Sequence, residues 1–590
     1  MRAVPLLVLL WAGLALAGER TRVERTEPFL APLASAELRD ETRPVARDVL
    51  RGGEGSARVV AGPVRVPAHA RLEVWFGVEG AESDRWQFDL RAKAGSRDLH
   101  ATASAGGGEG WLDLGLDVSG IAGEEATIEL VGRPERPGGG GRPVLGAPRF
   151  VVWRDVTAQG RNVIVVSLDT LRADRLSSYG AARPTSPQID ALAADGVRFA
   201  TALAPASSTP PSHMTLLTGT SPCRHGVWGV HLEDDLPDEI ETLAEVLGRD
   251  GYTTAAITEN AYVAAPYGFA RGFDSYVELK QMVADRNSPS PGVITPTGYA
   301  PKTFAAAGRW LRSNATRRFL LFVHTYQVHG PRRPTGEYAE LFPEPSPSGT
   351  PRPGFDPAFH DLRRYDQLVR QLDDLVGGMV HELTMLGIAG ETILVLTSDH
   401  GEAFFEHDDH GHGWSVFGEV LRVPLVVWAP GLARPSVVEA PVGLVDLTPT
   451  VLELLNLPVP GGLDGRSLAD VVRTGKGEPP SRAYYAETAP GNARSLRQGR
   501  FKIIRGKDEE EDSLFDLEND PGERAPVRLS GELPEALAGE QARIAALRAG
   551  LDRRAAACEA RRREADRLRD AKAAPDPARH EKLRALGYVE

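Results

Sequence analysis

Segments typical of strands alternate with segments typical of helices between Asn162 and Leu457, and this alternation constrains the fold more than any other feature. It begins with residues 163–168, a continuously apolar run of the kind found in the buried middle of a parallel sheet. Further segments follow at residues 187–195, 241–250, 253–258, 302–313, 319–323, 361–386, 391–396 and 424–428. The pattern predicts an α/β fold with helices flanking a mainly parallel sheet.

Residues that commonly bind metals stand at the ends of the predicted strands. Asp169 follows the first strand, His324 follows residues 319–323, and Asp399 and His400 follow residues 391–396. Ligands in such folds bind beyond the carboxyl ends of the strands, so we expect these side chains at one edge of the sheet. Carboxylate and imidazole together suit a divalent cation. Taken alone, an Asp-His pair at a strand end is equally consistent with a structural role.

Histidine is concentrated just after this pair. Four of the fourteen histidines fall within thirteen residues, at positions 400, 407, 410 and 412. A solvated acidic loop would not need them, so the crowding favours a functional site over a surface loop.

Residues 207–219 have the pattern of a helix start rich in hydroxyl groups. Thr209 is a favoured N-cap residue, and Pro210 suits the first helical position, where its missing N–H costs nothing. A helix N-terminus presents free N–H groups and the positive end of the helix dipole, so it can hold sulfate or phosphate beside a nucleophile. Taken alone, such a stretch is more often an ordinary capped helix.

The pattern of polar and apolar residues divides the N-terminal part of the chain into two segments. Residues 1–17 have the pattern of a signal peptide, with an apolar run too short for a comfortable transmembrane helix. We therefore expect an exported protein, periplasmic or secreted, with an uncleaved N-terminal anchor as the alternative. Residues 21–156 alternate polar and apolar side chains between glycine-rich turns, which predicts an accessory β-sandwich.

Three further parts are expected after the sandwich. The catalytic domain would span residues 160–475, and a small antiparallel subdomain would span residues 476–530. Residues 531–590 would form a helical tail, whose apolar residues recur at helical spacing at Ile544, Leu547, Leu551 and Cys558.

The net charge bears on binding partners, and the cysteine content bears on disulfide bonds. The net charge of −13 argues against nucleic acid as a partner. The only cysteines are Cys223 and Cys558, so the chain is no disulfide scaffold, and their separation in sequence gives no support for a bridge. We expect two unpaired thiols and no stable membrane span.

Ordered motifs give the chain a resemblance to the sulfatases of the alkaline phosphatase superfamily over residues 161–523. The motifs lie at residues 162–174, 209–219, 222–227, 272–274, 322–331, 398–402, 411–413, 419–424 and 514–523, and residues 586–589 resemble a tail of bacterial members. The resemblance implies the alkaline-phosphatase-like fold and a metal-dependent esterase activity.

The resemblance also implies roles for single residues. His329 stands where the family has a substrate-binding histidine, and His412 stands where many sulfatases have a lysine that contacts the sulfate and leaving group. The implied metal ligands are Asp169, Asp399, His400 and the nucleophile Thr209.

Three positions depart from the family pattern. Thr209 replaces the Cys or Ser that sulfatases oxidise to formylglycine, and threonine cannot form that aldehyde because its β-carbon carries a methyl group. No formylglycine is therefore expected. His213 replaces an arginine and Thr170 replaces an aspartate ligand. Relatives with such changes resemble phosphodiesterases, phosphonate hydrolases and phosphoryl transferases.

The ligands favour a single divalent cation. Oxygen-rich ligands suit calcium or magnesium, whereas the histidine suits manganese or zinc. An Asp-x-x-x-His pair, which binds a second metal in two-zinc relatives, is missing because Thr325 stands four residues before His329. A second site improvised from Asp408, Asp409 and His410 is the weaker alternative.

We therefore expect an exported, metal-dependent hydrolase of sulfate, phosphate or phosphonate esters, in which Thr209 attacks. Its substrate would be a sulfated or phosphorylated glycan, lipid or small molecule. His213 and His412 would bind the anionic group or protonate the leaving alcohol. Two alternatives stay open: a phosphoethanolamine-type transferase acting on an envelope glycan or lipid, and an inactive glycan-binding protein, which the metal motif disfavours.

Overall fold

The computed structural model describes most of the chain after residue 19. The described residues are 20–25, 34–40, 43–51, 57–66, 70–79, 84–106, 112–136, 141–146, 149–156, 160–228, 236–259, 261–279, 298–344, 356–479, 481–488, 491–506, 511–531 and 533–571. The predicted signal peptide at residues 1–17 and the family-like tail at residues 586–589 lie outside them. No helix in the described ranges is long and apolar enough to cross a membrane.

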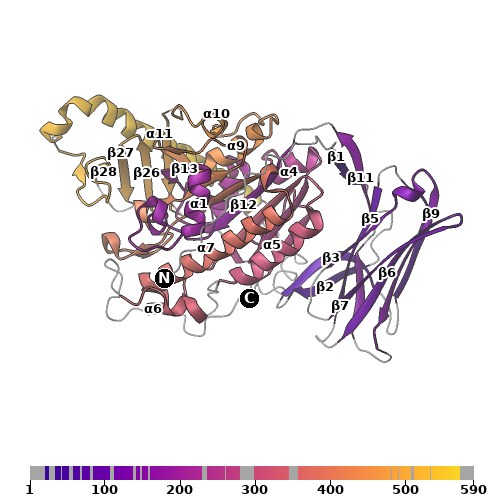
Figure 1. Ribbon diagram of the computed structural model, residues 1–590. Helices are drawn as coiled ribbons and strands as arrows, with labels where there is room; N and C mark the ends of the chain where they lie inside the picture. The colour runs from indigo at the N-terminus through magenta and orange to yellow at the C-terminus, as the bar shows by residue number, and fades with distance from the viewer. Residues whose placement is uncertain are drawn as a thin grey trace.

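A sheet that includes β12 and β13 forms the centre of the α/β body, to the left of the N-terminal strands in Figure 1. It has eight strands in the order β16-β15-β17-β12-β18-β22-β13-β23. All neighbouring pairs are parallel except those of β22, which runs antiparallel to β18 and β13. The strands span Ser275–Glu278, Thr253–Thr258, Phe319–Thr325, Asn162–Leu168, Thr392–Thr397, Leu425–Trp428, Val197–Phe199 and Ser436–Val438, in that order. The mainly parallel sheet predicted from the sequence is confirmed.

Successive side chains of β12 point to opposite faces of this sheet, and each face has its own apolar core. Val163 and Val165 join one core, whereas Ile164 and Val166 join the other, and all four are fully buried. Helices α2 (Thr209–Thr218), α4 (Leu243–Arg249), α9 (Leu447–Leu454) and α10 (Ala469–Thr474) contribute to the first core, and α1 (Pro187–Asp195), α5 (Ala300–Asn314) and α7 (Leu362–Met385) to the second.

Two antiparallel sheets form the N-terminal region, on the right of Figure 1. One has the order β1-β11-β5-β10-β3-β2, with β8 also paired to β5, and the other has the order β4-β9-β6-β7. Phe76 of β5 and Phe88 of β6 pack between the sheets with ring centroids 4.5 Å apart. The strands β1 to β11 span Arg20–Arg25, Ala34–Asp40, Arg43–Arg51, Ala57–Arg65, Ala70–Glu79, Arg85–Ala94, Arg97–Gly106, Leu112–Asp117, Glu125–Pro134, Arg142–Gly146 and Arg149–Val156.

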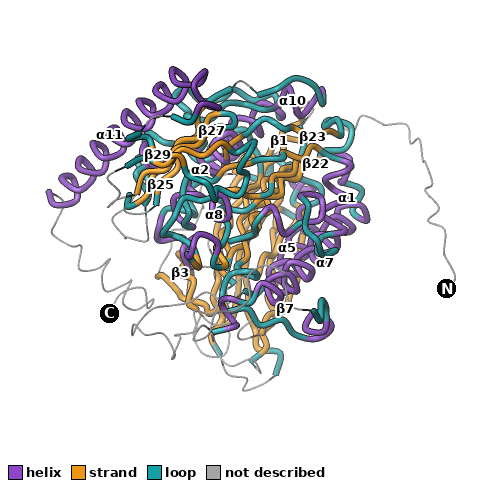
Figure 2. The backbone as a smooth tube through the Cα atoms, turned by 90° about the vertical axis from the view of Figure 1, so that its left-hand side faces the viewer, coloured by secondary structure: helices purple, strands orange, loops and turns teal. Residues whose placement is uncertain are grey.

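A five-stranded antiparallel sheet and a long helix form the C-terminal region. The strands β25 to β29 span Ala483–Glu487, Ala493–Gln498, Phe501–Gly506, Ser513–Asp516 and Val527–Arg528. Helix α11 (Gln541–Ala571) lies along this sheet at the upper left of Figure 2. Its residues Ile544, Leu547 and Leu551 are buried against the sheet, as their spacing predicts. The domain boundaries themselves remain predictions.

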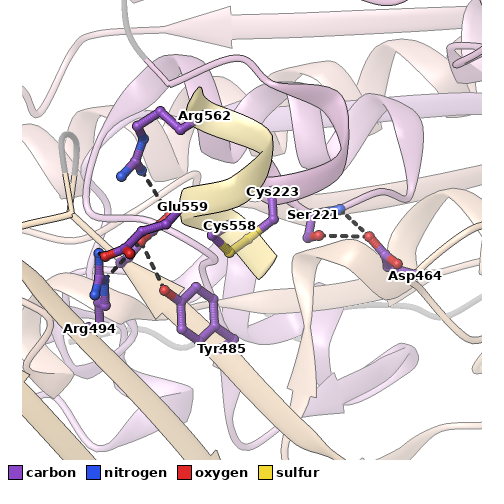
Figure 3. Close-up of a disulfide and its surroundings, with 9 residues drawn as sticks. Ser221, Cys223, Asp464, Tyr485, Arg494, Cys558, Glu559 and Arg562 are labelled. Carbon is purple, nitrogen blue, oxygen red and sulfur yellow. Dashed lines mark hydrogen bonds and ion pairs between the residues drawn. A yellow bond between two sulfur atoms is a disulfide. The ribbon is translucent and has the colours of Figure 1, made fainter. Parts of the chain in front are cut away.

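Cys223 and Cys558 form a disulfide, so the expectation of two unpaired thiols is wrong. Cys223 lies in the short helix α3 (Pro222–His225), and its Cα is 4.5 Å from that of Cys558 in α11 (Figure 3). A sequence separation of 335 residues carries no information about distance. Proximity arises only because α11 folds back across the C-terminal sheet to reach α3.

Charged side chains surround this disulfide (Figure 3). Arg494 donates to Glu559 at 2.6 Å, and Arg562 donates to the buried Glu487 at 3.1 Å. Because Glu487 belongs to β25 and Arg562 to α11, the ion pair and the disulfide hold the same helix in place.

Short elements complete the edge of the central sheet where β12, β17 and β18 end. They are β14 (Ala202–Leu203), α6 (Pro357–His360), β19 (Ala403–Phe404), β20 (His410–Gly411), α8 (Gly418–Leu421), β21 (Arg422–Val423) and β24 (Val442–Gly443).

Candidate active site and metal centre

Thr209 is the first residue of α2, and Ser208 is its N-cap. The prediction that Thr209 caps the helix is therefore wrong by one position, because Ser208 has the extended backbone (φ −148°, ψ 153°) of a cap. Ser208 makes no side-chain capping bond, and because Pro210 and Pro211 carry no N–H, Thr209 supplies the one backbone N–H among the first three residues of α2. The Thr209 hydroxyl donates to Asp169 Oδ2 at 3.3 Å and lies 3.3 Å from His400 Nε2.

The parallel strands β12 and β18 bring Asp169 and Asp399 together. Both side chains are fully buried. The backbone N–H of Thr170, a residue at φ 60°, donates to Asp399 Oδ1 at 3.2 Å. Asp169 Oδ1 and Asp399 Oδ2 are buried and accept no hydrogen bond within the described residues.

Electrostatics at this edge favour a bound cation. Burial, together with the neighbouring Asp399 charge, raises the pKa of Asp169 well above its usual value. The pKa of Asp399 is lowered instead: burial acts against this, but His400, His213 and His324 outweigh it. Two buried carboxylates that each keep an oxygen without a hydrogen bond fit a metal ion, which would neutralise both.

His400 is oriented to complete such a site. Its Nδ1 lies 2.9 Å from the Gly401 carbonyl and donates to it, which leaves Nε2 as the ligand atom. Burial lowers the pKa of His400 to about 4, so the ring is neutral at pH 7. Ligand atoms of Asp169, Asp399 and His400 lie within 4.8 Å of one another, and these three residues fit a divalent cation.

A second group of possible ligands comprises Asp169, His213 and His324. Both ring nitrogens of His213 already have close partners, however: Nε2 lies 2.8 Å from Ser167 Oγ and Nδ1 lies 3.0 Å from the Thr209 carbonyl. The first group is therefore the better metal site.

Among the described residues, no compact ligand group includes Asp408, Asp409 or His410, so the improvised second site gains no support.

His324 belongs to this site although it was not among the residues expected to act. Its Nε2 lies 3.4 Å from Asp169 Oδ2, and its ring centroid is 4.8 Å from that of His213. The signal was present in the sequence, since His324 is a metal-binding type of residue at a strand end. The family resemblance assigns no role to His324.

His412 extends over the site from the histidine-rich loop. Its ring centroid is 4.5 Å from that of His400 and 5.0 Å from that of His329. The Nδ1–H of His412 donates to Glu402 Oε1 at 2.9 Å, and Arg332 forms an ion pair with the other oxygen of Glu402. Burial lowers the pKa of His412, but the charge of Glu402 outweighs it and the pKa is raised.

Glu402 and Arg332 are functional candidates that sequence reasoning missed. Burial raises the pKa of Glu402, but the charges of Arg332 and His412 lower it by more than burial raises it. The carboxylate therefore stays ionised. Glu402 is the last residue of the motif at 398–402, and Arg332 directly follows the motif at 322–331. Only their contact in space shows that they act as a pair on His412.

His329 has a different electrostatic state from His412. Its Nδ1 lies 2.6 Å from the Gly330 carbonyl and donates to it, so Nε2 is an acceptor in the neutral ring. Burial lowers the pKa of His329 to about 3. The predicted residues Thr209, Asp169, Asp399, His400, His329 and His412 thus meet at one edge, with His213 beneath the start of α2.

Comparison with known sequences places this arrangement in a family. The model of the family described as Sulfatase matches residues 161–457, half of the chain, and that described as N-sulphoglucosamine sulphohydrolase, C-terminal, matches residues 410–548. The ulvan-active sulfatase of Formosa agariphila is 25% identical over 355 residues, covering 56% of this chain and 68% of that protein. Arylsulfatase A of Homo sapiens is 26% identical over 463 residues, covering 67% and 89%.

Solved structures agree on the fold. The phosphonate monoester hydrolase of Agrobacterium radiobacter is 21% identical with a TM-score of 0.53, covering 68% of this chain and 96% of that one. A protein solved with its substrate D-glucosamine-2-N,6-O-disulfate is 19% identical with a TM-score of 0.54, covering 68% and 98%. The chain belongs to the sulfatase family, whose members are metal-dependent hydrolases of ester bonds with an alkaline-phosphatase-like fold.

Proposed function

We propose that this protein hydrolyses sulfate, phosphate or phosphonate esters by attack of the Thr209 hydroxyl beside one divalent cation. The observation that carries the proposal is the position of Thr209 Oγ1, 3.3 Å from both Asp169 Oδ2 and His400 Nε2 at the start of a helix. A hydroxyl in this place meets a metal-type ligand group and the positive end of the α2 dipole together. Both would stabilise its alkoxide and the anionic group that it attacks.

Asp169, Asp399 and His400 would hold the cation. When bound, a divalent cation there would supply positive charge to the ester oxygens and to the attacking alkoxide. Carboxylate oxygens and the Thr209 hydroxyl outnumber the single imidazole nitrogen, which favours calcium or magnesium over manganese or zinc.

His412 is the candidate general acid. With Nδ1–H bonded to Glu402, its protonated ring keeps Nε2–H to donate to the departing alcohol. His329, neutral at pH 7, would accept a hydrogen bond from a substrate hydroxyl through Nε2. His213 contacts Ser167 and the Thr209 carbonyl, so we assign it to positioning the nucleophile rather than to proton transfer.

Phosphorus chemistry suits the threonine better than sulfur chemistry does. Attack of Thr209 Oγ1 on a phosphate ester forms a Thr–O–P bond, breaks the bond to the alcohol and passes a proton to that alcohol. Water then attacks phosphorus, releasing phosphate and restoring the hydroxyl. A threonine sulfate has no second hydroxyl with which to expel sulfate, so we favour phosphate or phosphonate esters and expect no formylglycine.

Some relatives are named for sulfated sugars, which suggests a glycan as the group that carries the ester. Among them are the glucosamine disulfate complex and an N-acetylgalactosamine-6-O-sulfatase of Bacteroides thetaiotaomicron. We propose that the chain acts on a glycan, lipid or smaller ester outside the cytoplasm, since a disulfide persists in oxidising compartments. The hydrolases found by comparison give no support to the transferase alternative.

A panel of p-nitrophenyl sulfate, phosphate, phosphodiester and phosphonate esters, each assayed with Ca²⁺, Mg²⁺, Mn²⁺ or Zn²⁺, tests the proposal. We expect metal-dependent turnover, with the phosphorus esters cleaved faster than the sulfate. Asp399→Ala should lose both metal and activity while keeping the circular dichroism of the wild type. Faster cleavage of the aryl sulfate would contradict the argument from threonine, and unchanged metal content in Asp399→Ala would place the cation elsewhere.

A further inference from the structure

A cavity of about 230 Å³ lies between the α/β body and the C-terminal sheet. The body contributes the segment around β14, including Ala204, and the region of α8 and β21. The C-terminal sheet contributes β25, β26 and β27. None of the site residues described above lines this cavity.

Five charged residues line the cavity: Arg422, Arg497, Lys502, Glu439 and Glu523. Two of them neutralise each other, because Lys502 Nζ donates to Glu523 Oε1 at 2.6 Å and both are almost fully buried. The second oxygen of Glu523 accepts from the Gly418 N–H at 2.7 Å. Glu439 is exposed at the rim. The interior charge that remains is therefore that of the two arginines.

Neither arginine has an ion-pair partner among the described residues. Arg422 donates from Nε and Nη2 to the Ala200 carbonyl at 3.3 and 2.9 Å, and Arg497 donates from Nε to the Gly499 carbonyl at 3.2 Å. The charge of Arg422 helps to lower the pKa of Asp174, but both oxygens of Asp174 accept from Arg172, at 2.9 and 2.8 Å.

The two guanidinium groups also repel each other. Burial lowers the pKa of Arg497 to about 10; Glu523 acts against this shift and Arg422 adds to it. Half-buried cations that repel each other and form no ion pair favour a bound anion. Arginine presents its N–H groups in a planar fork that matches the oxygens of sulfate and phosphate.

We propose that this cavity binds one tetrahedral oxyanion, a sulfate or phosphate group, between Arg422 and Arg497. A water occupies about 30 Å³ of liquid, so the cavity has room for an oxyanion of five non-hydrogen atoms and some solvent. The oxyanion is either free in solution or a second acidic group of an extended substrate. Ala204, at the cavity, precedes Thr209 by five residues, so their Cα atoms are at most about 18 Å apart, a distance within the length of an oligosaccharide.

Thermal unfolding of the full-length protein in sodium sulfate or sodium phosphate tests the site, with ionic strength held constant by chloride. An anion that binds only the folded state stabilises it by RT ln(1 + c/Kd) at anion concentration c, so the unfolding temperature rises with anion concentration by an amount that depends on Kd. We expect Arg497→Gln and Arg422→Gln each to weaken the apparent affinity roughly tenfold or more, the usual worth of a charge-assisted hydrogen bond. Arg497→Lys should keep part of the binding, because charge remains but the fork is lost.

Two controls separate this site from others. Arg434→Gln removes an exposed arginine that does not line the cavity, and it should leave the sulfate dependence unchanged. Asp399→Ala disables the sheet-edge site, and the cavity should still bind sulfate in that variant. Loss of all sulfate binding in Asp399→Ala, or unchanged binding in Arg497→Gln, would overturn the proposal. Because Arg497 has no ion pair to lose, Arg497→Gln should fold normally without sulfate.

Kinetics with two esters then identify the source of the oxyanion. This part of the test rests on the proposed hydrolase activity. If the oxyanion belongs to the substrate, Arg497→Gln should raise KM for a disaccharide that carries two phosphate esters and leave KM for p-nitrophenyl phosphate unchanged. If the oxyanion is free, both KM values should stay unchanged while the sulfate affinity falls. The unfolding assay needs no turnover, so a failure of the catalytic proposal would leave the binding result intact.

Discussion

The edge of the central sheet and the C-terminal region treat a buried carboxylate in opposite ways. Asp169, at the edge, keeps one buried oxygen without a hydrogen bond, and burial with the Asp399 charge raises its pKa. Asp512, beside β28, is nearly as buried but accepts from Arg505 at 2.6 Å and from Arg548 of α11 at 2.7 Å. Its pKa is lowered, since the arginines outweigh the effect of burial.

The contrast separates a binding site from a structural network. A carboxylate whose charge the protein already balances holds two elements together, as Asp512 holds α11 to the sheet. A carboxylate left unbalanced destabilises the fold by itself, and it is tolerated where a ligand balances it. The cavity between Arg422 and Arg497 is the corresponding case for positive charge: its arginines form no ion pair, and a bound anion would balance them.

The largest effect is expected at Thr209. Removing the hydroxyl in Thr209→Ala should lower kcat by about four to six orders of magnitude, as other nucleophile removals do, because no other described hydroxyl reaches both Asp169 and His400. Thr209→Ser should retain activity, since only a methyl group is lost. Steady-state kinetics on the best aryl ester, with metal content measured in parallel, checks both. Comparable activity in Thr209→Ala would remove the nucleophile from the proposal.

Thr209→Cys sharpens the choice between phosphorus and sulfur. Produced in a host that matures sulfatases, this variant could acquire formylglycine, although His213 stands where the maturation signal has arginine. If the aldehyde is detected by mass spectrometry, we expect aryl sulfatase activity to rise relative to phosphoesterase activity. An aldehyde without that change would show that the threonine does not set the preference.

The disulfide should give the largest effect on stability. Cys558→Ser should lower the free energy of unfolding by about 2–5 kcal/mol, because the bridge closes a very long loop. Denaturant unfolding with and without reductant measures it, and reductant should have little effect on the variant. Cys223→Ser is the matched partner and should behave alike. Equal stability of reduced and oxidised wild type would show that the C-terminal contacts suffice without the bridge.

Much of the fold was predictable because it rests on local patterns. The helix expected at residues 187–195 and the strand expected at residues 253–258 have those bounds, and α7 lies within one residue of its expected ends. Strand-end residues could be assigned to one edge because parallel strands share a direction. The disulfide could not be predicted, because it depends on where α11 packs after the C-terminal sheet has formed.

The sequence predicts which residues form the site, but it does not predict their protonation states. Thr209, Asp169, Asp399 and His400 follow from motifs, but the neutral ring of His329 and the raised pKa of His412 depend on burial and on Glu402. Motifs are contiguous in sequence, whereas the contact of Arg332 with Glu402 joins residues 70 apart. Charge states that arise from such contacts appear only when the chain is folded.

A pair of neutralising substitutions tests the comparison of the two regions. Asp169→Asn should abolish metal binding but raise the stability of the metal-free protein, because an ionised group with a raised pKa destabilises the fold at pH 7. Asp512→Asn should lower stability by about 1–3 kcal/mol, discounted for the partial exposure of its arginines. Unfolding in EDTA measures both, and stability changes of the same sign would break the comparison.

The smallest expected effect is a shift in a pH profile. If protonated His412 gives its proton to the leaving alcohol, kcat/KM should fall as pH rises through the pKa of His412. Because the Glu402 charge raises that pKa, Glu402→Gln should lower it and move the alkaline limb to lower pH, most visibly for esters with poor leaving groups. Glu419→Gln is the matched control: Glu419 raises the pKa of His407 through a 2.7 Å contact in the same way, but the His407 ring contacts Glu523 and Phe417 and not Thr209 or His412. A limb that stays in place in Glu402→Gln, or moves equally in both variants, would demote His412 to binding the substrate.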